Sequence, residues 1–149
     1  MKCVSLYQPW ATLVVLGAKR YETRSWATEY RGRLGIHASR TWRPECEELC
    51  RQESVRRLLR AAGYRSTADL PRGALLGTVE LVDCVATEFL MPEDLGAEQR
   101  RLGDFRPGRF AWKLLDPVRL AAPLRLCGQL GVFDADVPGP AMPWPQAAG

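Results

Sequence analysis

The sequence predicts an α+β fold in which five or six short strands form a small mixed β-barrel with two or three flanking helices. Segment 74–85 (ALLGTVELVDCV) is apolar on both faces, so it requires cover on both sides. Helical patterns interrupt the short strand patterns without the regular alternation of a βαβ repeat. The length of 149 residues suits one domain with a sizeable core.

The first 17 residues predict a strand followed by a helix. Residues 1–6 are apolar enough for a short strand. Pro9 suits the first turn of a helix, because its missing N–H would have no partner there. The helix runs to Leu16 and ends at Gly17, and its run of apolar residues leaves little polar face. We therefore expect this helix to be buried.

Two extended segments follow the first helix. Residues 19–26 alternate with period two, which places Glu22 and Arg24 on one face of a strand. Residues 34–39 (LGIHAS) form another strand pattern, and this segment contains His37, the single histidine of the chain. A lone histidine inside a strand predicts a hydrogen-bonded core residue rather than a ligand-binding one.

Residues 43–62 carry the signals of a complete helix. Pro44 stands near the start, acidic side chains fill the first turns, arginines follow near the end, and Gly63 lies just beyond. The apolar positions form two offset stripes, which predicts a bend near Ser54.

The second half of the chain is predicted to be mostly strand. Glu80 stands in the middle of the long strand 74–85, where a buried carboxylate is costly unless it has a partner. Residues 92–101 predict a short charged helix or turn. Further strands are expected at 110–115, where Trp112 should lie in the core, at 124–127 and around 132–133. We place one domain at 1–133 and a proline-rich tail at 134–149.

Composition narrows the class of protein. The chain has no run of about 18 apolar residues and no signal-peptide pattern at its start, so we expect a cytoplasmic protein without membrane spans. The five cysteines are scattered, and Cys46 and Cys50 suit buried apolar positions better than a zinc site. We expect no metal and no other cofactor. The net charge of +4 permits polyanionic partners.

Several short motifs resemble the ASCH domain family, in the same order, over residues 1–133. The most specific motif is G-x-K-x-x-E-x-R, formed here by Gly17, Lys19, Glu22 and Arg24. The other matching pieces are Gln8-Pro9-Trp10, Ile36-His37, Leu70-Pro71-x-Gly73, Gly77-Thr78-Val79-Glu80 and Phe110-Ala111-Trp112.

This resemblance implies a PUA-like fold: a small β-barrel with helices packed against it and a cleft beside the helix that precedes the motif. ASCH domains are proposed to bind RNA, and the family includes proteins associated with transcription coactivation and translation. A few small bacterial members are amidohydrolases that act on N4-acetylcytidine and related N-acylated nucleosides. Others are proposed ribonucleases.

The first functional hypothesis is that the cleft binds RNA or a modified nucleoside. Lys19, Arg24 and Arg40 would contact phosphates. Aromatic side chains beside cationic groups suit stacking on bases. The remaining candidate contacts lie near the motif or at a strand end: Tyr7, Gln8, Trp10 and Trp42.

The second hypothesis is an amidohydrolase of N-acylated nucleosides. Lys19 would act as base and Glu80 would donate a proton, with Glu22 completing the set. The amidohydrolase members place a threonine three residues after the lysine, where this chain has Glu22, and Thr23 would point to the other face. This departure favours binding over catalysis.

A third hypothesis is a protein-interaction module, in which the barrel only presents a surface to another protein. A cleft filled by Trp10, or closed by the Glu22 and Arg24 pair, would favour it.

Overall fold

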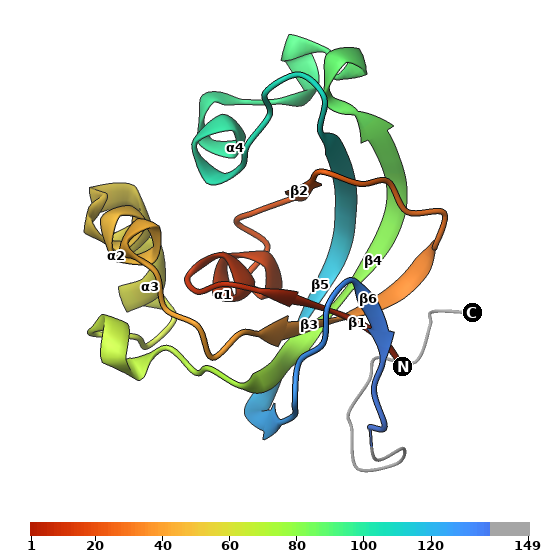
Figure 1. Cartoon of the computed structure of the whole chain (residues 1–149). Coiled ribbons are helices and arrows are strands. Elements are labelled where there is room, and N and C mark those ends of the chain that lie inside the picture. The colour runs from red at the N-terminus through yellow and green to blue at the C-terminus, as the bar shows by residue number, and fades with distance from the viewer. Residues whose placement is uncertain (138–149) are drawn as a thin grey trace.

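The computed structural model describes residues 1–137 and is built on one curled, six-stranded sheet (Figure 1). The strand order is β2-β5-β4-β3-β1-β6, and only the pair β1 and β3 is parallel. The α+β half-barrel confirms the expected fold class and strand number. The strands are β1 (Lys2–Leu6), β2 (Tyr21–Arg24), β3 (Gly32–Ala38), β4 (Ala74–Ala86), β5 (Phe110–Arg125) and β6 (Val132–Asp134).

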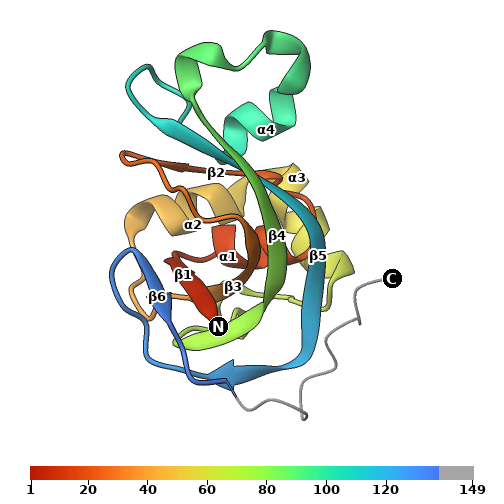
Figure 2. The same ribbon diagram turned by 90° about the vertical axis from the view of Figure 1, so that its right-hand side faces the viewer.

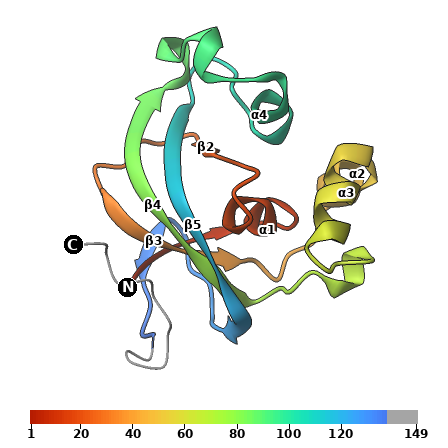
Figure 3. The same ribbon diagram turned by 180° about the vertical axis from the view of Figure 1, so that it is seen from behind.

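Helix α1 (Trp10–Val15) fills the hollow of the sheet, as its apolar sequence predicts. Ala11, Val14 and Val15 pack against the strands, whereas Leu13 packs against the second helical layer. That layer consists of α2 (Pro44–Arg51) and α3 (Glu53–Ala61). Figures 1 and 3 show α1 enclosed between the sheet and these two helices.

The segment 43–62 forms two helices rather than the expected single bent one. The chain turns at Gln52, whose ψ of 132° is extended, two residues before the expected bend at Ser54. The two offset apolar stripes explain the break, because one straight helix cannot direct both stripes toward Leu13.

Strand β5 runs without interruption from Phe110 to Arg125 and pairs with β4 along its length (Figure 2). The expectation of two separate strands in this region is wrong. Asp116 has a positive φ of 50°, and together with Pro117 it lies where the register shifts between Thr78 and Glu80. Pro117 has no N–H to donate to the sheet, and a β-bulge at this point lets the pairing of β4 with β5 continue beyond it.

The remaining segments contain α4 (Ala97–Leu102) and three short 3₁₀ turns, Thr67–Asp69, Thr87–Phe89 and Pro92–Asp94. Trp112 is fully buried, as expected, and meets Trp26 edge-on with ring centroids 4.9 Å apart. Cys46 and Cys50 are also buried, as expected.

Within residues 1–137, no helix is long and apolar enough to cross a membrane. The same residues hold no group of three or more side chains able to ligate a metal ion. The division into residues 1–133 and 134–149 stays a prediction, and residues 138–149 of the predicted tail lie outside the described part of the chain.

Candidate ligand-binding cleft

A cleft of about 960 Å³ opens beside the N-terminal end of α1. Its wall includes the end of β1, strand β2, the end of β3, residues 101–104 at the C-terminal end of α4, and the loop 126–131. The motif that the resemblance singled out therefore lies in this wall.

The turn at Gly17 delivers Lys19 to the cleft. Gly17 has a φ of +80°, which disfavours any residue with a side chain, and an added Cβ would lie 3.2 Å from Pro117. The carbonyl of Leu13 then accepts hydrogen bonds from the N–H groups of Ala18 and Lys19, both at 3.0 Å. This closes α1 and turns the chain toward β2.

Lys19 is buried rather than solvated, with 2% of its surface exposed. Its Nζ donates to the carbonyl of Tyr21 at 2.5 Å and to that of Leu102 at 2.8 Å. The Oε1 of Glu22 lies 3.9 Å from Nζ. Burial lowers the pKa of Lys19, Glu22 opposes that shift, and Arg24 adds to it. The ammonium thus ties the end of α4 to the motif.

Glu22 and Arg24 lie on the same face of β2, as the alternation predicts. Their side chains form an ion pair, with 3.4 Å between Glu22 Oε2 and Arg24 Nη2. Glu22 Oε1 also accepts the N–H of Thr23 at 2.9 Å, and Arg24 Nη2 donates to the carbonyl of Ser5 at 2.7 Å. The pair does not close the cleft and Trp10 does not fill it, because both line the remaining volume.

Helix α4 and the segment after it hold the motif in place, which sequence reasoning missed. Gln99 is 4% exposed; its Oε1 accepts the N–H of Arg20 at 2.9 Å and its Nε2 donates to Ala18 at 2.8 Å. The N–H of Asp104 donates to Thr23 Oγ1 at 3.0 Å. The one sequence signal was Gln99 itself, three residues before the buried Leu102 on the same helical face.

Asp104 organises two arginines at this end of the cleft. Arg106 donates two hydrogen bonds to its carboxylate, and Arg109 Nε lies 3.3 Å from it. These contacts, the hydrogen bond from Arg106 first, lower the pKa of Asp104 to about 2. Arg109 also donates to the carbonyl of Thr23 at 3.2 Å, so it braces β2.

The charges that line the cleft are mainly positive. The two carboxylates are Glu22 and Asp104. Across the described residues, no carboxylate lies within 4.0 Å of the guanidinium groups of Arg40 or Arg101. The cationic lining residues are Lys19, Arg24, Arg40, Arg101 and Arg109.

Tyr7 and Trp10 supply the aromatic part of the lining. The Tyr7 side chain is exposed, and the guanidinium of Arg43 lies 5.0 Å from its ring centroid. Arg40 packs closely over Gly73, where an added Cβ would come within 2.7 Å of Arg40 Nε. Gly73 therefore lets Arg40 lie along the cleft edge.

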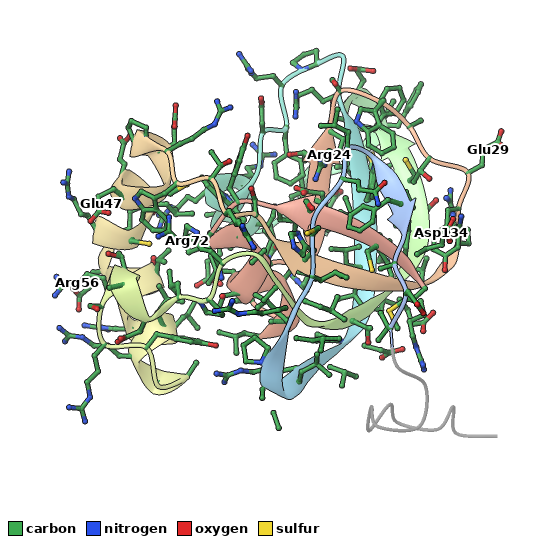
Figure 4. The ribbon with its side chains drawn as sticks, turned by 60° about the horizontal axis from the view of Figure 1, so that its bottom comes forward. Arg24, Glu29, Glu47, Arg56, Arg72 and Asp134 are labelled. Atoms are coloured by element: carbon green, nitrogen blue, oxygen red, sulfur yellow. The ribbon has the colours of Figure 1, made fainter. Side chains whose placement is uncertain are left out.

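Two predicted contact residues lie elsewhere. Gln8 is fully buried, donates to the carbonyl of Pro71 at 2.7 Å and accepts the N–H of Thr12 at 3.0 Å. Trp42 is not part of the cleft lining; it packs with the second helical layer, and the guanidinium of Arg72 lies 5.8 Å from its ring centroid. Figure 4 labels Arg72 toward this helical layer and Arg24 over the strands.

Glu80 does not meet Lys19, so the amidohydrolase hypothesis is wrong in combining the two as acid and base at one site. Val79 and Leu81 face α1 in the core, and alternation along β4 turns Glu80 to the outer face of the sheet. There it pairs across the sheet with Arg33, with 3.8 Å between Arg33 Nε and Glu80 Oε1, and both side chains are 36% exposed.

His37 is buried and hydrogen-bonded, as expected, and it also lines the cleft. Its Nδ1 lies 2.8 Å from Ser5 Oγ and its Nε2 lies 2.7 Å from the carbonyl oxygen of Leu126. Burial lowers the pKa of His37 below its ordinary value.

Comparison with known proteins agrees with the motif. The ASCH domain profile matches residues 4–113. Activating signal cointegrator 1 is 46% identical over 84 residues in Mus musculus and 45% identical over 84 residues in Homo sapiens. Each match covers 56% of this chain and only 14% of the relative's length. A crystal structure of ASCH from Zymomonas mobilis aligns with a TM-score of 0.48 and 17% identity, over 84% of this chain and 73% of that one. Because the family profile spans well over half of its residues, the chain belongs to the ASCH domain family.

Proposed function

We propose that the cleft binds RNA or a nucleotide-sized ligand that carries phosphate. The observation that carries this proposal is the charge imbalance: five cationic side chains line the cleft against two carboxylates. Excess positive charge in a concave site attracts a polyanion and releases its counterions. The chain belongs to the ASCH family, whose members generally resemble RNA-binding domains, and this membership supports the same class of ligand.

The contacts differ in their roles. Arg40 and Arg101 have the guanidinium groups most available to phosphate, and Arg24 adds a third inside the cleft. Lys19 acts indirectly, because its ammonium is already bonded to two carbonyls. Tyr7 and Trp10 offer rings on which a base can stack. Trp42 would meet only a ligand that extends beyond the cleft.

Binding of a labelled single-stranded oligoribonucleotide, followed by fluorescence anisotropy across a salt titration, tests this proposal. The logarithm of the association constant should fall linearly with that of the salt concentration, and Arg40→Gln should reduce the slope by about 0.7. Arg57→Gln is the matched control, since Arg57 is an exposed arginine on α3 outside the cleft. Affinity that ignores salt, or equal losses in both variants, would contradict the proposal.

A second candidate function is hydrolysis of N-acylated nucleosides. The buried Lys19 favours it, because its pKa is lowered and Glu22 lies 3.9 Å away in a cleft of ligand size. Release of acetate from N4-acetylcytidine should then be lost in Glu22→Gln and retained in Glu80→Gln. Absence of turnover by the wild-type protein would remove this candidate.

A further inference from the structure

The cleft contains a serine and a histidine that neither proposed role uses. Ser5 on β1 and His37 on β3 are directly paired across two parallel strands, so their side chains are neighbours on one face of the sheet. Ser5 Oγ lies 2.8 Å from His37 Nδ1, and both residues line the cleft. This is the distance at which an imidazole accepts a hydroxyl proton.

The tautomer of His37 follows from its other neighbour. Nε2 lies 2.7 Å from the carbonyl oxygen of Leu126, and a carbonyl only accepts hydrogen bonds, so Nε2 must carry a proton. In the neutral ring Nδ1 then holds a lone pair, and the Ser5 hydroxyl donates to it. Burial lowers the pKa of His37. The hydrogen bond to the Leu126 carbonyl opposes that shift and the charge of Arg40 adds to it, and the lowered pKa favours the neutral ring.

A positive group stands beside the serine. Arg24 Nη2 donates to the main-chain carbonyl of Ser5 at 2.7 Å, which holds the guanidinium next to the hydroxyl-bearing residue. The Arg24 side chain is 25% exposed and lines the same cleft. A cation fixed in this place would stabilise negative charge that develops on a carbonyl oxygen attacked by Ser5.

The loop 126–131 covers the pair from one side. A Cβ added at Gly128 would lie 2.6 Å from Ser5 Oγ and 2.7 Å from His37 Cε1. Only glycine lets the chain pass this close, so the two side chains are partly screened from water. Ser5 itself is only half-buried, which leaves a side open to the cleft.

We propose that Ser5, His37 and Arg24 form an acyl-transfer centre that hydrolyses carboxylic esters held in the cleft. Ser5 Oγ attacks the acyl carbon, its proton passes to His37 Nδ1, and the departing alcohol takes that proton as its C–O bond breaks. Water then attacks the acyl-serine ester and gives a proton to His37. His37 returns that proton to Ser5 Oγ as the carboxylic acid leaves. The inference rests on the proposed function only in that the cleft must admit a ligand.

Esters rather than amides are the expected substrates. The partner of His37 Nε2 is the neutral carbonyl of Leu126, whereas an aspartate at this place would stabilise the imidazolium that forms during attack. A pair without that carboxylate suits the better leaving group, an alcohol. This centre is also distinct from the pair formed by Glu22 on β2 and Lys19 just before that strand, which uses no hydroxyl nucleophile.

The test uses the full chain with p-nitrophenyl acetate, and peptide mass spectrometry locates any acetyl group. We expect an acetyl adduct on Ser5, and a loss of hydrolysis of at least about tenfold in Ser5→Ala and in His37→Gln. Ser54→Ala is the control, because Ser54 is an exposed serine on α3 outside the cleft. The control should hydrolyse the ester at the wild-type rate.

Absence of acetyl on Ser5 in the wild-type protein would overturn the inference, even where Ser5→Ala fails to fold. Acetylation of Lys19 in its place, or unchanged hydrolysis by a folded Ser5→Ala variant, would also overturn it. Oligoribonucleotide binding measured on the same samples separates the two proposals. RNA binding without ester hydrolysis would contradict only the acyl-transfer centre. Ester hydrolysis without salt-dependent RNA binding would contradict only the proposed RNA-binding function.

Discussion

The cleft presents two kinds of positive charge. The motif residues Lys19 and Arg24 are bonded to main-chain carbonyls and to Glu22. The rim arginines, Arg40 and Arg101, line the same cleft without an ion pair among the described residues. The most specific part of the motif therefore builds the wall of the cleft, and the charges most available to a ligand lie outside the motif.

The largest expected effect comes from breaking the motif wall. Lys19→Met removes the ammonium that joins Tyr21 to Leu102 and leaves two buried carbonyls without a donor, so we expect a loss of about 3 kcal/mol in the free energy of unfolding. Urea denaturation measures it. Lys113→Met is the control, because Lys113 is exposed on β5 and should change stability by less than about 0.5 kcal/mol. Similar losses in both variants would show that Lys19 has no special structural role.

The pH dependence of stability sharpens the same point. In the folded protein the pKa of Lys19 lies below 10.5, the ordinary value for a lysine and the one expected in the unfolded chain. Between these two pKa values the unfolded chain therefore binds more protons than the folded protein. Wild-type stability should therefore rise relative to Lys19→Met as the pH increases through the folded-state pKa toward 10.5. Urea titrations of both proteins at several alkaline pH values measure the difference. A constant difference across that range would mean that burial does not disfavour the charged lysine.

The rim arginines should show the opposite behaviour, with an effect on binding and none on stability. The double variant Arg40→Gln, Arg101→Gln is expected to weaken oligoribonucleotide binding about tenfold, equivalent to about 1.4 kcal/mol. Its free energy of unfolding should stay within about 0.5 kcal/mol of wild type. Anisotropy and urea denaturation on the same preparations check both halves. A variant that loses stability and keeps its affinity would reverse the assignment of the two groups.

Local patterns in the sequence were sufficient for much of the fold. A helix apolar on all sides had to be enclosed, and α1 is; the alternation at residues 19–26 correctly placed Glu22 beside Arg24. The continuity of β5 could not be predicted from local signals, because the bulge at Asp116 and Pro117 is stabilised by pairing with β4, which is distant in sequence.

The residues that form the site were harder to predict, because they too depend on contacts between segments that are distant in sequence. Strand β4 is apolar on both faces, so its sequence does not reveal which face meets α1, and Glu80 was assigned to the wrong side. Gln99 contacts the motif across about 80 residues of chain, a pairing that no local period encodes. The only sequence signal was the position of Gln99, three residues before the apolar Leu102 on a short helix.

The smallest expected effect is on Glu80, which the sequence alone does not distinguish from Glu22 because both are glutamates in strands. Glu80→Gln removes a half-exposed ion pair with Arg33 on the outer face, so stability should change by at most about 0.5 kcal/mol and oligoribonucleotide binding should not change. Glu22→Gln is the comparison, since Glu22 is 12% exposed and supports both Arg24 and the N–H of Thr23. It should cost about 1 to 2 kcal/mol by urea denaturation. A larger loss in Glu80→Gln than in Glu22→Gln would mean that the ion pair on the outer face stabilises the fold more than the ion pair in the cleft.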